Sequence, residues 1–113
     1  MKPNLNCAAL NILIAERADI VLLDVRRRPA FQDEPRLLPS AVWRDPEQVA
    51  TWAAELDRHQ PVIVYCVHGH EVSQGVAGHL REAGFDAAAL EGGIEAWKAA
   101  GGPVAVPHGG TGS

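Results

Sequence analysis

Two segments of the sequence are apolar at every position, Ile20–Leu23 and Val62–Cys66. A strand that faces water on one side alternates apolar and polar residues, whereas a strand that is apolar throughout is buried on both faces. Strands of this kind belong to parallel sheets that carry a layer of helices on each side. The two segments therefore predict an α/β domain built on a mostly parallel sheet.

Helices and shorter strands are predicted around these two segments. A helix is expected to begin after Asp45, which is a favourable N-cap, and to end before Pro61. Gly75 and Gly78 fall inside another predicted helix and indicate close packing on the sheet, because glycine otherwise weakens a helix. The three prolines between residues 27 and 40 predict an irregular connection. The remaining expected helices are residues 4–17, 73–83 and 94–100, and the remaining expected strands are residues 41–43 and 85–90.

Length and charge limit the classes of partner. The 113 residues, 47% of them hydrophobic, suit one globular domain, expected over residues 1–104 with a mobile glycine-rich tail at 105–113. With 10 lysines and arginines against 14 aspartates and glutamates, the net charge of -4 argues against a nucleic-acid partner. No secretory signal and no membrane-spanning apolar run are visible, so we expect a cytoplasmic protein with no membrane partner.

Cys66 is the residue of greatest chemical interest, because it ends a buried strand and precedes a short loop that contains Gly69. Ligands of parallel sheets bind at the carboxyl ends of the strands. Loop amides and the start of the following helix, expected at Ser73, form a site that attracts anions and favours the thiolate, which is the nucleophilic form of cysteine. The alternative is that Cys66 is a small buried apolar residue, as we expect for Cys7.

Two histidines flank Gly69 in the loop after the cysteine. His68 and His70 are candidates for a partial positive charge beside the nucleophile, although a single loop histidine is more often simply solvated. Together with Cys66 they spell Cys-x-His-x-His, which invites a zinc interpretation. Three nearby ligands with no second cysteine or histidine cluster are too few for that, so neither a metal nor a cofactor is expected.

Several dispersed stretches of the sequence point to a known family. They are Leu22-Leu23-Asp24-Val25-Arg26; Pro39-Ser40-Ala41-Val42; Val64-Tyr65-Cys66 with Gly69 three residues beyond; and Leu90-Glu91-Gly92-Gly93-Ile94 with Trp97 and Gly102-Pro103-Val104. With these stretches in this order, the chain resembles the rhodanese-like family from about Ile20 to Val104. The segment Tyr65–Gln74 is also similar to a subgroup associated with chromate-resistance proteins. The resemblance implies a central, mostly parallel five-stranded sheet with helices on both faces.

The resemblance also implies an activity. Members of the family are sulfurtransferases whose cysteine takes a sulfane sulfur from thiosulfate or a similar small anionic donor, becomes a persulfide, and passes the sulfur to cyanide, a thiol or a protein acceptor. In the family the equivalents of Asp24 and Arg26 brace the active-site edge, and the arginine sometimes lies near the donor. The expected site therefore has Cys66 as nucleophile, Asp24 in structural support, and as substrate-binding residues Val67, His68, Gly69, His70, Glu71, Val72, Ser73 and Arg26.

The loop departs from the family pattern in two ways. Glu71 stands where active members usually carry an arginine, and Ser73 comes one residue later than their serine or threonine. A longer loop resembles that of dual-specificity phosphatases and arsenate reductases, but those enzymes clamp the oxyanion with an arginine, and none lies between Cys66 and Arg81. Sulfur transfer is therefore favoured over phosphoryl transfer or arsenate reduction. A catalytically weak module that binds a partner or senses an anion is the other alternative, and we expect Glu71 to point away from the donor.

Overall fold

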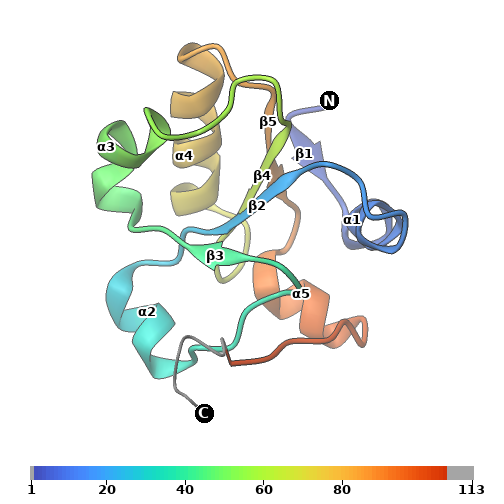
Figure 1. The fold of residues 1–113 in the computed structure, drawn as a ribbon. Helices are drawn as coiled ribbons and strands as arrows, with labels where there is room; N and C mark the ends of the chain where they lie inside the picture. Colours follow the sequence, from blue (N-terminus) through green and yellow to red (C-terminus); the bar gives the residue numbers. More distant parts are fainter. Residues whose placement is uncertain (1, 107–113) are drawn as a thin grey trace, which may run out of the picture.

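The computed structural model describes residues 2–106 and contains one five-stranded sheet in the order β1-β5-β4-β2-β3, with every pair of neighbouring strands parallel (Figure 1). The fold prediction is confirmed. The strands are β1 (Asn4–Leu5), β2 (Val21–Asp24), β3 (Val42–Trp43), β4 (Val62–Tyr65) and β5 (Ala87–Leu90). β4 is the central strand, so the residue that follows it lies in the middle of one edge of the sheet.

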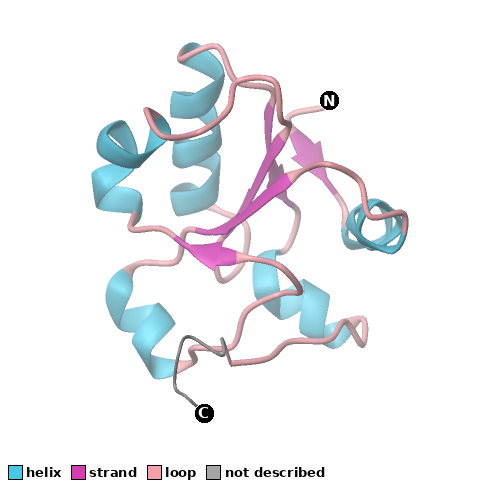
Figure 2. Cartoon of the chain, viewed as in Figure 1, coloured by secondary structure: helices cyan, strands magenta, loops and turns pink. Residues whose placement is uncertain are grey.

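Helices cover both faces of the sheet, which explains the uninterrupted apolar segments (Figure 2). Ile63 and Tyr65 of β4 pack with Leu10 and Ile94, from α1 (Cys7–Ala15) and α5 (Gly93–Ala99). Val62 and Val64 point to the opposite face, where the core is completed by α3 (Val49–Ala53) and α4 (Glu71–Glu82). Neither side of β4 faces water, and all four of its residues are fully buried.

The N-terminal prediction is partly wrong. Residues 4 and 5 form an edge strand that pairs with β5, where the sequence predicted the beginning of a helix. The helix begins at Cys7, because the side chain of Asn6 caps it by accepting a hydrogen bond of 2.8 Å from the amide of Ala9. The helix therefore begins three residues later than predicted.

Three further helices differ from their predictions. The stretch predicted as irregular contains α2 (Arg28–Asp33), which has Pro29 in its first turn, where a helix tolerates a proline. The helix predicted after Asp45 is shortened to a 3-10 turn, Pro46–Gln48, followed by the five residues of α3. α4 begins at Glu71, two residues earlier than predicted, and His70 precedes it without a side-chain cap.

The glycines of α4 do not lie against the sheet. A Cβ atom placed on Gly75 would meet no atom within 4 Å, and one on Gly78 would meet only the Arg81 guanidinium, at 3.9 Å. Close packing, the predicted reason for both glycines, is therefore wrong. Each glycine still weakens the helix by about 1 kcal/mol relative to alanine. The fold itself therefore gains nothing from Gly75, which leaves an opening on the surface of the helix.

The end of the described chain stays attached to the domain. Ala105 exchanges two backbone hydrogen bonds with Leu37, of 2.9 and 3.0 Å, one residue beyond the boundary expected at residue 104. The rest of the predicted tail, residues 107–113, lies outside the described residues. Within residues 2–106, no helix is long and apolar enough to cross a membrane.

Candidate active site

Cys66 follows β4 directly and lies at the carboxyl edge of the sheet, as the sequence predicted. The residue is only 6% exposed, but it lines a cavity of about 490 Å³ that opens to solvent. A thiol that is shielded by protein and reached through a cavity suits a nucleophile that must exclude water yet admit a small substrate. The other lining residues are Arg26, Arg27, Ala30, Val67, His68, His70, Glu71 and Val72.

A single hydroxyl contacts the sulfur. The thiol of Cys66 donates to Oγ of Ser73 at 3.1 Å, and Ser73 is completely buried. A hydroxyl rotates freely enough to reverse this bond, so the same group donates to the sulfur once the thiol has ionised. Ser73 therefore contacts the sulfur of the predicted nucleophile, although it lies inside the first turn of α4 and not ahead of the helix.

The start of α5 fixes the orientation of the loop after Cys66. The amides of Ile94 and Glu95 donate to the carbonyls of Cys66 and Val67 at 2.9 and 3.1 Å. In a trans peptide the N–H points opposite to the C=O of the same unit. The N–H groups of Val67 and His68 are therefore directed away from α5, on the side where these two residues line the cavity.

The N–H groups of residues 67–73 have no backbone partner among the described residues, and the first amide of α4 to be bonded is that of Gln74, to the carbonyl of His70 at 3.1 Å. Free donors at a helix start, together with the partial positive charge of the helix dipole, form an anion-binding site. The donors that the predicted cradle needs are therefore without a backbone partner among the described residues, and their role in binding an anion stays a prediction.

Two glycines allow the loop to lie this close to α5. Gly69 has φ of +75°, and a Cβ atom there would come within 2.7 Å of the amide nitrogen of Gly92 and 2.8 Å of the carbonyl oxygen of Leu90. Gly93 has φ of +60°, and its Cβ atom would meet the carbonyl oxygen of Cys66 at 2.4 Å. Both positions require glycine for two reasons, namely the positive φ of the backbone and the closeness of neighbouring backbone atoms.

Arg26 does not have the environment that we expected of a donor-binding residue. It is 2% exposed, and its guanidinium contacts the Asp24 carboxylate at 2.6 Å and the carbonyls of Glu34 and Arg36 at 2.7 and 2.8 Å. Asp24 is completely buried as well. The pair holds the segment after α2 against β2, so Arg26 borders the cavity with its donors engaged in structure, which supports the bracing role that we predicted for Asp24.

Arg27 is the residue that sequence reasoning missed. Among the described residues its side chain has no hydrogen bond, ion pair or ring contact, whereas Arg28 pairs with Asp45 at 3.3 Å and lies over the Trp43 ring at 4.8 Å. Arg27 lines the Cys66 cavity. Nothing in a run of three arginines distinguishes the buried member, the paired member and the free one, so only the tertiary structure identifies Arg27.

The remaining predicted loop residues surround the opening of the cavity. His68 and His70 are exposed, with ring centroids 6.3 Å apart, and Glu71 is exposed in the first turn of α4. A carboxylate at a helix start interacts favourably with the helix dipole. Among residues 2–106, no group of three or more histidine, cysteine or acidic side chains could hold a metal ion.

Fold and site together define a class: a parallel α/β domain with a cysteine at the carboxyl edge of its central strand and a free helix start beside the sulfur. A family model described as the rhodanese-like domain matches residues 9–100. The chain belongs to the rhodanese-like family.

Curated relatives and solved structures agree with this assignment. The chain is 37% identical over 87 residues to the thiosulfate sulfurtransferase GlpE of Coxiella burnetii, covering 76% of this chain and 78% of that protein. It is 32% identical to the protein of the same name from Pseudoalteromonas translucida, covering 81% and 86%. The rhodanese-like domain of the Anabaena protein Alr3790 superimposes with a TM-score of 0.80 at 28% identity, covering 98% and 84%. A thiosulfate sulfurtransferase from Pseudomonas aeruginosa gives a TM-score of 0.80 at 29% identity, and 93% of this chain matches 20% of that one.

Proposed function

We propose that the protein is a thiosulfate sulfurtransferase in which Cys66 carries the sulfur. The observation that carries the proposal is the position of the Cys66 sulfur, 3.1 Å from a buried hydroxyl and beside a run of unpartnered amides at the start of α4. The curated relatives described above are named thiosulfate sulfurtransferases. In this proposal Ser73 and the amides of residues 67–73 stabilise negative charge on sulfur and on the donor.

The first half-reaction loads the enzyme. The Cys66 thiolate attacks the outer sulfur of thiosulfate, a new S–S bond forms, the S–S bond of the donor breaks, and sulfite leaves with the bonding electron pair. Loop amides without a backbone partner among the described residues can stabilise the departing charge without rearranging, which is the main electrostatic contribution expected of such a site. In the second half-reaction cyanide or a thiolate attacks the outer sulfur of the persulfide, and Cys66 leaves as a thiolate.

Intact-mass analysis after incubation with thiosulfate tests the proposal. We expect the wild-type chain and Cys7→Ser to gain one sulfur atom that cyanide removes, and Cys66→Ser to gain none. Retention of the added sulfur in Cys66→Ser places the carrier elsewhere. A wild-type chain that gains no sulfur overturns the proposal.

A weak binding module is the second candidate, because one observation favours it. Glu71 lines the cavity, where its carboxylate opposes an anionic donor. If the protein is an enzyme, the wild type should form a detectable persulfide, and Glu71→Gln should lower the KM for thiosulfate. If the protein is an anion sensor, thiosulfate binds to the wild type without releasing sulfite.

The proposed setting is the cytoplasm, with a thiol or a protein as the natural acceptor. Cys7 and Cys66 are both free cysteines, and reducing compartments keep thiols in this form. A persulfide intermediate depends on the same condition, because oxidation of the thiolate removes the nucleophile.

A further inference from the structure

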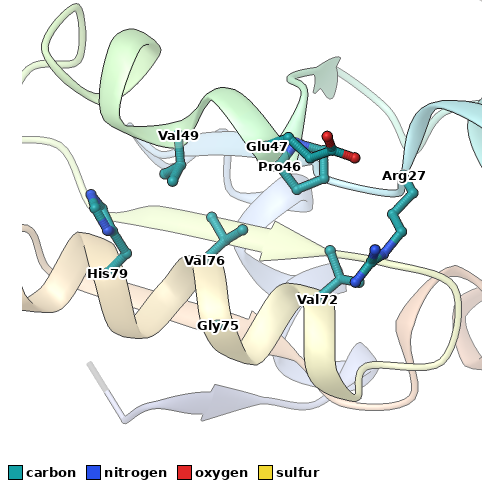
Figure 3. Close-up of a pocket in the computed structure, with 8 residues that line it drawn as sticks. All are labelled: Arg27, Pro46, Glu47, Val49, Val72, Gly75, Val76 and His79. Atoms are coloured by element: carbon teal, nitrogen blue, oxygen red, sulfur yellow. The ribbon is translucent and has the colours of Figure 1, made fainter.

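A second concave surface lies beside the active site, between α4 and the segment that leads into α3 (Figure 3). The groove has a volume of about 270 Å³. Val49 and Val76 point toward each other across it, and His79 lies at one end while Arg27 and Glu47 lie at the other (Figure 3). An apolar centre with polar groups at its ends is the usual composition of a small-molecule site.

Gly75 keeps this groove open. It lines the groove from the exposed side of α4, and a Cβ atom there would meet nothing within 4 Å. The glycine therefore serves neither close packing nor an unusual backbone angle, since its φ lies outside the left-handed region. Any larger side chain at this position projects into the space that the groove offers to a ligand.

The groove adjoins the Cys66 cavity. Arg27 and Val72 line both of them. The guanidinium of Arg27, which has no partner among the described residues, therefore stands at the junction, and its side chain reaches over Val72 at the start of α4 (Figure 3). A molecule that occupies the groove can extend a short arm past Arg27 toward the sulfur.

We propose that the groove binds the sulfur acceptor, and that the acceptor is a short peptide thiol with free carboxylates. Arg27 and His79 match carboxylates at the two ends of the groove, Glu47 matches an amine or an amide N–H, and the valines match the methylene groups between them. This inference rests on the sulfurtransferase activity proposed above, because it assigns the acceptor of that reaction.

The transfer balances without a further reactant. The thiolate of the bound peptide attacks the outer sulfur of the Cys66 persulfide, an S–S bond forms to the peptide, and the S–S bond to Cys66 breaks. The peptide leaves as a persulfide and Cys66 returns to the thiolate. No oxidant or reductant is consumed, because one thiol replaces another as the partner of the same sulfur.

Gly75→Leu tests the proposal, with Gly78→Leu as its matched control. Both substitutions replace a glycine of the same helix by the same helix-favouring residue, but only Gly75 lines the groove. Persulfide loading by thiosulfate measures the first half-reaction. Discharge of the persulfide by cyanide measures transfer to an acceptor too small to need the groove. Glutathione is the probe for the groove, and cysteamine, a thiol without a carboxylate, is the comparison.

We expect Gly75→Leu to raise the KM for glutathione by about tenfold or more, as blocking part of an apolar site does, while Gly78→Leu leaves it unchanged. Arg27→Gln should raise the KM for glutathione more than that for cysteamine, whereas Arg17→Gln, at the exposed end of α1, should change neither. Equal glutathione kinetics in the two leucine variants overturn the groove proposal while leaving the sulfurtransferase proposal standing. If the wild type forms no persulfide at all, the proposed function fails first.

Discussion

The sulfur of Cys66 has a contact that its position in the sequence does not specify. Ser73 lies seven residues after Cys66, where a serine in a loop and a serine in a helix look alike. Because α4 begins at Glu71, the side chain of Ser73 projects from the first helical turn back to the sulfur at 3.1 Å. The sequence predicted Ser73 among the residues around Cys66, but its contact with the thiol follows only from the helix start.

Ser73→Ala should therefore slow the formation of the persulfide. Hydrogen bonds to a charged group contribute about 1.5–3 kcal/mol, so we expect sulfite release in a single turnover to fall by about tenfold to a hundredfold. The midpoint of denaturant unfolding checks that the variant is folded. An unchanged rate of sulfite release contradicts the assignment of Ser73 to the sulfur.

The reactivity of the Cys7 thiol should depend on pH. Burial, with a further contribution from the charge of Glu91, raises the pKa of the Cys7 thiol. A raised pKa keeps the thiol protonated to higher pH, so the reactive thiolate of Cys7 forms only above the ordinary thiol value of about 8.5. In Cys66→Ser, which retains Cys7 as its single cysteine, alkylation by iodoacetamide should stay slow at pH 7 and accelerate only above about pH 8.5. Rapid alkylation of this variant at pH 7 contradicts the expectation.

At the scale of elements, the loop between β4 and α4 depends on a glycine that cannot be replaced. Gly69→Ala introduces both a left-handed residue and a contact of 2.7 Å with the backbone of Gly92. We expect a lower free energy of unfolding and loss of persulfide formation, because the amides of the loop can no longer adopt their positions.

Gly101→Ala is the matched control for this substitution. Gly101 also has a positive φ, of +84°, but a Cβ atom there would meet nothing within 4 Å. Gly101→Ala therefore carries only the cost of placing alanine in a left-handed conformation, about 1–2 kcal/mol. Thermal or denaturant unfolding should show the larger loss for Gly69→Ala. Equal losses in the two variants indicate that conformation alone, and not the approach to Gly92, requires glycine at position 69.

An element could be predicted from the sequence only where the interactions that stabilise it leave a recognisable pattern of residues. β2 and β4 were recognised because burial on both faces leaves an uninterrupted apolar run. β1 has only two residues, too few to show any period, and it exists because β5 offers an edge. The start of α4 was missed because His70 precedes it without a side-chain cap, and capping residues are the signal on which a sequence reading relies.

At the scale of the whole molecule, a buried network of polar groups attaches the segment between α2 and β3 to the sheet, beside the edge where Cys66 lies. Asp24 ends β2 and pairs with Arg26, whose guanidinium donates to the carbonyls of Glu34 and Arg36. The hydroxyl of Tyr65, on β4, accepts a hydrogen bond of 3.2 Å from the amide of Leu38. Burial raises the pKa of Tyr65, so its hydroxyl stays neutral and available for this bond. The segment between α2 and β3 is thus attached to the sheet by polar contacts that hydrophobic patterning could not predict.

Asp24→Ala should consequently destabilise the whole domain. It leaves the guanidinium of Arg26 buried at 2% exposure without its carboxylate, and breaking a buried ion pair on one side costs about 3–5 kcal/mol, a large part of the 5–15 kcal/mol that stabilises a typical domain. Glu55→Gln, which removes the partner of Arg44 in an exposed pair at 3.6 Å, should cost at most about 1 kcal/mol. Denaturant unfolding compares the two variants. A loss for Asp24→Ala no larger than that of the control means that the network is not what attaches this segment to the sheet.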